Sequence, residues 1–263
     1  MHMLSDQLSN MKTCGLREEV DLVLSLCREN LSTSEIARRS AIPRSTVKDW
    51  RRGQIPSHRA SFPPGPCPGH DLAALNSSAY AYLLGMYLGD GCISAANRGV
   101  WKLRITLDSI YPSIVAECVN AVRAVKHGRA HIQEKRGDRA VEVSSYWKHW
   151  PCLIPQHGPG RKHNRPIVLA DWQQRIVNDH VEQFLRGLIH SDGTRIIATE
   201  RKRQNIRKAP RYAFSNRSED ILGIFWAACE VAGVHCTRAS RHQIAIYSKA
   251  AVARLDEFIG PKS

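Results

Sequence analysis

The stretch YLLGMYLGDGCI, residues 82–93, places the strongest constraint on the fold. Apolar side chains surround the helix that it predicts, so we expect this helix to be buried. Gly85 and Gly89 lie four residues apart, which lets a second helix backbone approach closely. The helix is predicted to end at Gly91 in the left-handed conformation, directly after Asp90. Because the helix dipole disfavours a carboxylate at a C-terminus, Asp90 needs a specific role.

A second copy of the stretch, LRGLIHSDG, occupies residues 185–193, with Asp192 placed 102 residues after Asp90. Its small residues, Gly187 and Ser191, recur at the same spacing. The pattern after each copy is also the same: two strands, a helix and two more strands. Predicted helices cover 79–91, 111–125, 180–193, 219–233 and 250–260; predicted strands cover 92–97, 100–108, 128–135, 140–146, 194–200, 211–216, 234–240 and 243–248. A repeat this long indicates a duplicated domain rather than a solenoid.

The two aspartates are predicted to meet, because two helices that cross at their small residues bring their ends together. Like charges so close raise a pKa or require a cation, and Mg²⁺ is held by one or two carboxylates together with waters and substrate phosphates. Such a site suits metal-assisted phosphodiester cleavage. The alternative is that each Asp-Gly pair is simply a helix-ending turn.

These two motifs and the order of elements after them resemble the LAGLIDADG homing endonucleases over about residues 76–260. The resemblance implies an α+β fold, a duplicated αββαββα unit with pseudo-two-fold symmetry, whose two saddle-shaped sheets straddle double-stranded DNA. It implies that Asp90 and Asp192, with the preceding Gly89 and Ser191, hold two or three Mg²⁺ ions. In the family a lysine between the repeats assists catalysis; GPGRKHNRPI at 158–167 resembles that stretch, so Lys162 is the candidate, with Arg161 and His163 as rivals.

The function implied is site-specific, Mg-dependent cleavage of both DNA strands, as in intron homing. The alternative is a DNA-binding transcriptional regulator that does not cleave, since a related subgroup of bacterial sporulation regulators joins a LAGLIDADG-like domain to a helix-turn-helix. A third hypothesis, an accessory protein of transposition or recombination, rests only on the small N-terminal domain. The retained Asp90 and Asp192 favour the nuclease, because buried carboxylates without a partner are costly.

An N-terminal domain, residues 14–55, is predicted to contain three helices, the second started by a capping box from Ser32 to Glu35. Ile42, Val47 and Trp50 are expected to face inward, which turns a basic, hydroxyl-bearing surface outward. The domain resembles a helix-turn-helix, and the outward residues predicted to bind DNA are Arg44, Ser45, Thr46, Lys48, Arg51 and Arg52. A three-helix bundle with a solvated basic face is the alternative.

Residues 56–76 are proline-rich and form a predicted linker, followed by repeat 1 (77–165) and repeat 2 (166–263). Charge supports a polyanionic partner, because the 263-residue chain carries a net charge of +14. Residues 195–211 alone hold seven Lys or Arg side chains and one acid. The residues of the repeats predicted to bind DNA are Arg104, Lys135, Arg136, Arg195, Arg201, Lys202, Arg203, Arg207, Lys208 and Arg211, with Thr106, Gln133 and Asn216 also predicted to face the groove.

No apolar run approaches the length that spans a bilayer, and the N-terminus lacks the pattern of a secretory signal. We therefore expect a cytoplasmic protein, nucleoid-associated if bacterial, and a monomer with internal pseudo-dimer symmetry. The eight cysteines are expected to be reduced. No zinc is expected: Cys67 with His70 and His58, or Cys152 with His149, His157 and His163, lack the regular ligand spacing of a zinc site.

Overall fold

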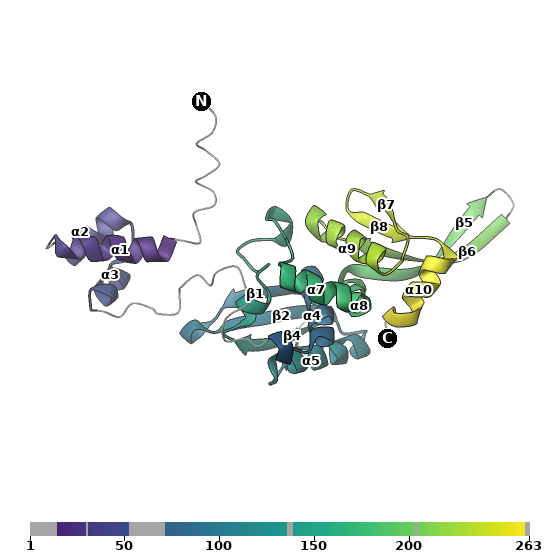
Figure 1. Ribbon diagram of the computed structural model, residues 1–263, viewed down its shortest axis with the longest axis horizontal. Helices are drawn as coiled ribbons and strands as arrows, with labels where there is room; N and C mark the ends of the chain where they lie inside the picture. Colours follow the sequence, from purple (N-terminus) through teal and green to yellow (C-terminus); the bar gives the residue numbers. More distant parts are fainter. Residues whose placement is uncertain (1–14, 30, 53–71, 136–138, 203–204, 261–263) are drawn as a thin grey trace, which may run out of the picture. The chain divides into compact units, whose positions relative to one another are not determined.

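The computed structural model describes residues 15–29, 31–52, 72–135, 139–202 and 205–260 (Figure 1). The chain divides into two units, residues 1–63 and 64–263, and each is described by itself. No helix within the described ranges is long and apolar enough to cross a membrane.

The first unit contains three helices, α1 (Gly15–Arg28), α2 (Thr33–Ser40) and α3 (Arg44–Arg51). The predicted cap of α2 is confirmed, since the side chain of Ser32 accepts a hydrogen bond from the amide of Glu35. Ile42, Val47 and Trp50 are buried as predicted and pack in one cluster with the side chains of α1 and α2. Ala41 has a positive φ of 58° in the turn that separates α2 from α3.

The second unit begins with a short 3₁₀ helix, Leu72–Ala74, in the segment that the sequence assigned to the linker. Leu72 and Leu75 pack against the main core, and Asn76 caps α4 by accepting from the amide of Ala79. Residues 72–76, which the sequence assigned to the linker, therefore belong to the packed unit.

Repeat 1 consists of α4 (Ser77–Asp90), β1 (Gly91–Ala95), β2 (Trp101–Asp108), α5 (Pro112–Lys126), β3 (His131–Glu134) and β4 (Ala140–Trp147). Repeat 2 consists of α8 (Val181–Asp192), β5 (Gly193–Lys202), β6 (Asn205–Ser215), α9 (Glu219–Val231), β7 (Thr237–Ser240) and β8 (Gln243–Ile246), and α10 (Lys249–Ile259) closes the chain. The predicted αββαββ order of both halves and the closing helix are confirmed.

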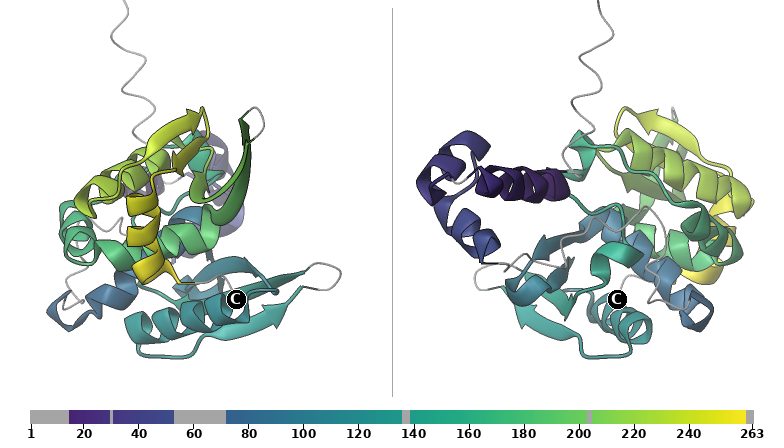
Figure 2. Two further views of the ribbon diagram at one scale, coloured as in Figure 1. Left: turned by 90° about the vertical axis from the view of Figure 1, so that its right-hand side faces the viewer. Right: turned by 60° about the vertical axis from the view of Figure 1, so that its left-hand side comes forward.

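Each repeat forms a four-stranded antiparallel sheet, and the strand order is equivalent, β1-β2-β4-β3 and β5-β6-β8-β7. The first residue of each sheet occupies the same place, because Gly91 pairs with Ile105 and Gly193 pairs with Phe214. One face of each sheet is apolar: Leu103 and Ile105 join the same core as α5, and Phe214 stacks on Phe225 of α9. Figure 2 shows the β3–β4 and β5–β6 hairpins on the same side of the unit in its left view.

Helices α4 and α8 cross at glycine, as the spacing of small residues predicted. A Cβ atom on Gly85 would lie 2.5 Å from the carbonyl oxygen of Phe184, and one on Gly187 would lie 2.2 Å from that of Tyr82. The two contacts are reciprocal, since each glycine meets the residue three positions before its counterpart. This reciprocity, together with the matched sheets, shows the pseudo-two-fold symmetry of the duplicated unit.

The predicted left-handed ends of these helices are wrong. Gly91 has φ −88° and ψ 152°, and Gly193 has φ −99° and ψ 162°, so both continue directly into extended strands. Glycine is required instead for space, because a Cβ would lie 2.5 Å from the Cα of Tyr87 or 2.6 Å from the Cα of Ile189. The strands therefore start immediately after each aspartate.

Two further differences concern the segments around α8. The sequence placed a loop at 201–210, whereas β5 runs to Lys202 and β6 starts at Asn205, which makes one long hairpin. The connection between the repeats contains α6 (Trp150–Leu153) and α7 (Asp171–Asp179), neither of which was predicted. Gln173 of α7 donates hydrogen bonds to the hydroxyl of Tyr80 and to Gln156, which fixes this connection to α4.

Candidate metal site and nucleic-acid interface

The crossing of α4 and α8 brings the two predicted metal-binding helix ends into contact. A Cβ on Gly89 would lie 2.2 Å from Oγ of Ser191 and 3.2 Å from Cγ of Asp192. The hydroxyl of Ser191 donates to the carbonyls of Gly187 and Leu188 of its own helix. Asp90 and Asp192 each end their helix at this contact, as the aligned motifs predicted.

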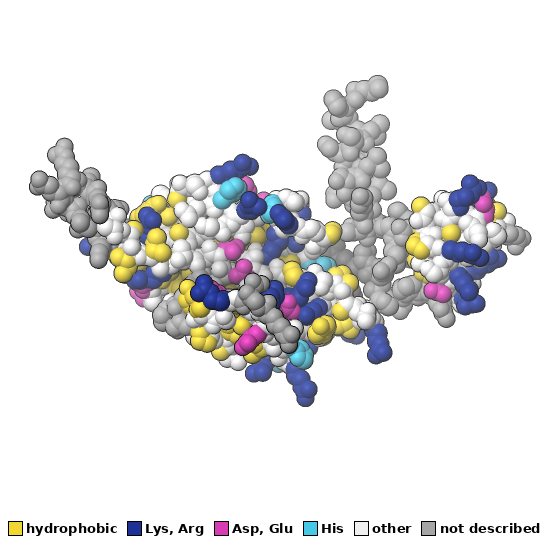
Figure 3. Space-filling view, turned by 180° about the vertical axis from the view of Figure 1, so that it is seen from behind, with side chains coloured by type: hydrophobic (Ala, Val, Ile, Leu, Met, Phe, Trp, Pro, Cys, Tyr) yellow, Lys and Arg dark blue, Asp and Glu magenta, His cyan; other side chains and the backbone are white. Residues whose placement is uncertain are grey.

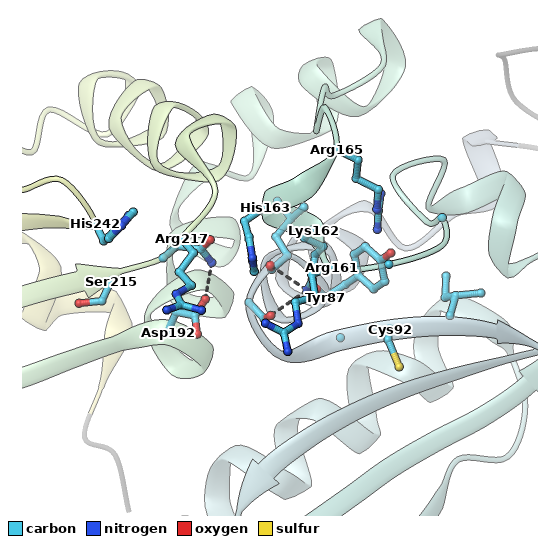
Figure 4. A pocket seen from close by; sticks show the side chains of 17 residues that line it. Tyr87, Cys92, Arg161, Lys162, His163, Arg165, Asp192, Ser215, Arg217 and His242 are labelled. Atoms are coloured by element: carbon cyan, nitrogen blue, oxygen red, sulfur yellow. Dashed lines mark hydrogen bonds between the residues drawn. The ribbon is translucent and has the colours of Figure 1, made fainter. Parts of the chain in front are cut away.

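Asp192 lies in the larger of two pockets at these helix ends, here called the Asp192 pocket. Its walls come from the end of α4, the loop 158–165, and residues 215–217 at the end of β6. Figure 4 shows Asp192 and Arg217 on one side, with Tyr87, Arg161 and Lys162 facing them. The amide of Asn216 donates to Oδ2 of Asp192 at 2.6 Å, which fixes the direction of this carboxylate.

Lys162 occupies the centre of this pocket and is bound to the end of α4. Its Nζ donates to the carbonyl oxygens of Tyr87, Leu88 and Gly89 at 2.5, 2.9 and 2.7 Å, and lies 5.0 Å from the centroid of the Tyr87 ring. Burial lowers the pKa of Lys162 to about 8, although the Asp192 and Asp90 carboxylates favour its charged form. All three N–H donors of the ammonium are thus engaged, so the structure places Lys162 as a cap on α4.

Asp90 lines a second pocket, here called the Asp90 pocket, at the equivalent place in repeat 1. Its walls come from residues 106–108 at the end of β2, from Tyr111, Arg139 and Ala140, and from His190 and Ser191 of α8. The side chain of His190 is buried: Nδ1 is 3.0 Å from the hydroxyl of Tyr82, and Nε2 is 3.1 Å from the carbonyl oxygen of Ile259. His190 therefore packs inside the fold and ties α8 to the end of α10.

The donor set at the helix ends suits a hard divalent cation. The side-chain donors are carboxylates at the ends of two helices that touch, since a Cβ on Gly89 would meet Ser191 and Asp192, and both carboxylates favour the charged form of Lys162. Among the described residues no three His, Cys, Asp or Glu side chains form a metal cluster. Mg²⁺ fits such a pair, because it takes one or two carboxylates and completes its shell with water and phosphate. The carbonyl of Gly89, one of the predicted ligands, accepts from Lys162 in the structure.

The sheet of repeat 1 places its predicted DNA-binding residues on one face. Thr106 and Gln133 both pair with Glu142, so all three side chains lie on the sheet face that points away from the core. Arg104 lies two residues before Thr106 on β2 and therefore faces the same way. Lys135 reaches the same face, since its Nζ donates to the hydroxyl of Thr106. Arg136 lies outside the described residues. Figure 3 shows Lys and Arg side chains spread over one side of the second unit, with Asp and Glu side chains among them.

Arg195 requires a correction. Arg195 pairs with the buried Tyr212, so its side chain lies on the same face of the sheet as Tyr212. The guanidinium of Arg195 forms two hydrogen bonds of 2.7 Å with Asp256 of α10. It therefore holds α10 to the sheet instead of facing a groove.

The other predicted contacts of repeat 2 are only partly described. Arg211, half-buried, lies on the opposite face from Tyr212 and so shares the face predicted to bind DNA. Arg203 lies outside the described residues. The side chains of the remaining cluster also lie outside the described part: Arg201, Lys202, Arg207 and Lys208.

Most of the N-terminal residues predicted to bind DNA are exposed on or next to helix α3. Arg44, Ser45, Lys48 and Arg52 are exposed, and Thr46 is half-buried. Arg51 is engaged within the unit, since its guanidinium donates to the carbonyl of Leu31 and the hydroxyl of Thr33 at 3.3 Å each. Arg51 therefore secures α3 against the start of α2, which reduces its reach toward a groove.

The residues considered for zinc lie in different settings. His149 is 3.9 Å from the thiol of Cys152, His157 contacts the carbonyl of Ile154, and His163 lies in the Asp192 pocket. His58, Cys67 and His70 lie outside the described residues. The six described cysteines are free thiols.

Sequence reasoning missed several residues of the pockets, among them Tyr87, Arg217 and His242, and it did not predict that Asn216 would contact Asp192. A usable signal exists for the end of β6. The apolar run 212–214 stops there, and its partner strand β5 starts at Gly193, directly after Asp192, so the residues after Phe214 lie near Asp192.

No family model and no curated protein matches this chain. Solved structures similar to it include a mesophilic variant of the homing endonuclease I-DmoI, at 19% identity and a TM-score of 0.45, covering 70% of this chain and 90% of that one. The N-terminal LAGLIDADG domain of DUF199/WhiA is 15% identical with a TM-score of 0.43, covering 70% and 83%. I-DmoI in complex with DNA and Mn is 16% identical with a TM-score of 0.44, covering 70% and 98%.

Proposed function

We propose that this protein binds double-stranded DNA at a specific site and cleaves both strands in a Mg²⁺-dependent reaction, acting as a monomer. The observation that carries the proposal is the contact of two helix ends that each finish on an aspartate, beside a pocket lined by Arg161, Lys162 and Arg217. The carboxylate pair provides a place for a metal ion, and the cations around it provide a place for a phosphodiester.

The reaction class is phosphodiester hydrolysis. A water oxygen bonds to phosphorus while the bond from phosphorus to the 3′ oxygen breaks; the water loses a proton to solvent, and the 3′ oxygen gains one. Bound Mg²⁺ would lower the pKa of water and neutralise charge that develops on the leaving oxygen. Arg161 and Arg217 are positioned to hold the phosphate, and Asn216 orients Asp192. Lys162 supports the same site by holding the end of α4 in place.

DNA recognition is assigned to two surfaces. The face of sheet 1 that carries Arg104 and Lys135 would contact the duplex beside the metal site, together with Arg211 of sheet 2. Helix α3 would read a separate segment through the exposed Arg44 and Lys48, as recognition helices do in the major groove. This second surface also supports the alternative function, a regulator that binds DNA without cleaving it.

Two substitutions separate these functions. Duplexes bound by the protein are first selected from a randomised pool in Ca²⁺, and the bound duplexes are then incubated with Mg²⁺. We expect Asp90→Asn and Asp192→Asn to retain binding and to lose cleavage, whereas the same change at Asp179, on α7 outside both pockets, should affect neither. If the wild-type protein leaves every selected duplex intact in Mg²⁺ and in Mn²⁺, the nuclease proposal is wrong and the regulator remains.

A further inference from the structure

The two pockets at the helix ends are equivalent halves of one pseudo-symmetric site, but their residues differ. The shared register of Gly91 with Ile105 and of Gly193 with Phe214 aligns residues 106–108 with residues 215–217. Thr106 thus corresponds to Ser215, Leu107 to Asn216 and Asp108 to Arg217. The first pair is similar in chemistry, whereas the other two pairs are not.

Charge differs sharply between the halves. Among the residues that the structure describes, the Asp192 pocket contains four Lys or Arg side chains and one acid. On the same basis the Asp90 pocket contains two acids, Asp90 and Asp108, and one cation, Arg139. A phosphodiester is an anion, so the Asp192 pocket attracts it and the Asp90 pocket does so much less.

The residues at the position of Asn216 differ as well. Asn216 is held by three hydrogen bonds. Its side-chain amide donates to Asp192, its side-chain oxygen accepts from the backbone amide of Ser218, and its backbone amide donates to the carbonyl of His242. At the equivalent place in repeat 1, Leu107 is 5% exposed and joins the hydrophobic core, so it offers no hydrogen-bond donor. Residues that orient a metal-binding carboxylate raise the activity of the site they serve.

We infer that the two half-sites work at unequal rates, so that the strand whose phosphate enters the Asp192 pocket is cut first and a nicked duplex accumulates. The inference rests on the proposed nuclease function and specifies how its two halves differ. Each cut is the same hydrolysis, and only its rate is set by the pocket. The positioning residues for the fast half-site are Asn216 and Arg217; Asp108 slows the other half-site.

The experiment uses the full-length protein and a selected duplex that carries a different fluorophore on the 5′ end of each strand. Single-turnover rates are measured for both strands in Mg²⁺. For the wild-type protein we expect the two rates to differ by about tenfold or more, given the usual effect of an orienting partner. Binding in Ca²⁺ and the melting temperature are recorded for every variant, so that a loss of folding is recognised.

Four variants change the residues that differ between the two halves. Arg217→Asp places at this exposed position the residue that repeat 1 carries, and we expect it to slow only the fast strand, by roughly 10- to 100-fold. Asn216→Leu should act on the same strand, and Asn216→Gln, which retains the amide, should restore part of the rate. Asp108→Asn keeps the oxygen that accepts from the amide of Ile110 and should speed only the slow strand.

Asp179→Asn is the matched control, because it removes the same charge as Asp108→Asn from an exposed position outside both pockets. It should leave both rates unchanged. Equal rates for the two strands of the wild-type duplex, or variants that slow both strands alike, would overturn the inference while the nuclease proposal stands. A duplex that is bound but never cut refutes the nuclease proposal and this inference with it.

Discussion

Replacing Gly187 by alanine tests the helix crossing on which the site depends. The added Cβ would lie 2.2 Å from the carbonyl oxygen of Tyr82 and 3.0 Å from the amide nitrogen of Met86. Real Cβ atoms do not approach closer than 3.0 Å, so α4 and α8 must separate by about 0.8 Å at this point. Both contacts are backbone atoms inside helices, which cannot turn aside as a flexible side chain would.

The expected loss follows from two opposing terms. Overpacking of a close-packed interior costs about 1–3 kcal/mol or more, whereas replacing glycine by alanine inside a helix gains about 1 kcal/mol. Because the obstacle is backbone, we place the first term at its upper end and expect the free energy of unfolding to fall by about 2 kcal/mol. The separation also moves the two aspartates apart, and a displacement of about 1 Å can reduce a rate by about 100-fold.

The assay is urea unfolding of the wild-type protein and of Gly187→Ala, with cleavage of a selected duplex measured on the folded variant. The control is Gly223→Ala in α9, where an added Cβ meets no atom within 4 Å. This variant should gain about 1 kcal/mol from helix propensity alone. If Gly187→Ala is as stable as Gly223→Ala, the close backbone crossing is refuted.

Three further predictions concern individual cations. Lys162 loses its proton near pH 8 in the native state but keeps it to about pH 10.5 in the unfolded chain. Between these pH values the free energy of unfolding should therefore rise by about 1.4 kcal/mol per pH unit, and urea titrations of Lys162→Met should lack this rise. Arg104→Ala should reduce the salt dependence of DNA binding, with a slope smaller by about 0.9, whereas Arg195→Ala should leave that slope unchanged, as measured by fluorescence anisotropy at several salt concentrations. Arg186 bonds to Glu117 and to the last carbonyls of α10, so Arg186→Met should lower the unfolding free energy by about 2 kcal/mol without changing the DNA affinity of the folded protein.

The duplicated architecture was predictable because its signals are local and occur twice. The buried helix of residues 82–90 and the stripe of apolar residues in its copy identify α4 and α8, and the alternation of apolar residues identifies the strands that follow. The contact of the two glycines could also be expected, since small residues at this spacing allow close approach. Each of these features can be read within a segment of about a dozen residues, so none of them requires knowledge of contacts between distant parts of the chain.

The orientation of strand residues was harder to predict. The sequence started the strand of repeat 2 at residue 194 with a left-handed glycine before it, whereas β5 starts at Gly193. The face of Arg195 is set by its pairing with Tyr212, and a pairing register uncertain by one residue leaves that face undetermined. The role of Asn216 could not be predicted either, because its contact with Asp192 joins residues 24 positions apart through the fold. The engagement of Lys162 by carbonyls of α4 depends in the same way on long-range packing.

Helix α7 was missed although its pattern is visible, since Trp172 and Ile176 lie four residues apart and Val177 follows. The buried hydrogen bonds of Gln173 with Tyr80 and Gln156 explain why the segment is ordered as a helix against α4. Polar residues that complete such networks do not show in a hydrophobic pattern.

The central claim is that Asp90 and Asp192 act on shared divalent cations beside bound DNA. The direct measurement is a Mn²⁺ titration of the protein–duplex complex, followed by electron paramagnetic resonance, for the wild-type protein, Asp90→Asn, Asp192→Asn and the double variant. Shared ions predict that each single change weakens Mn²⁺ binding and that the double change weakens it by less than the sum of the two. Losses that add independently, or tight Mn²⁺ binding that persists in the double variant, would contradict the claim.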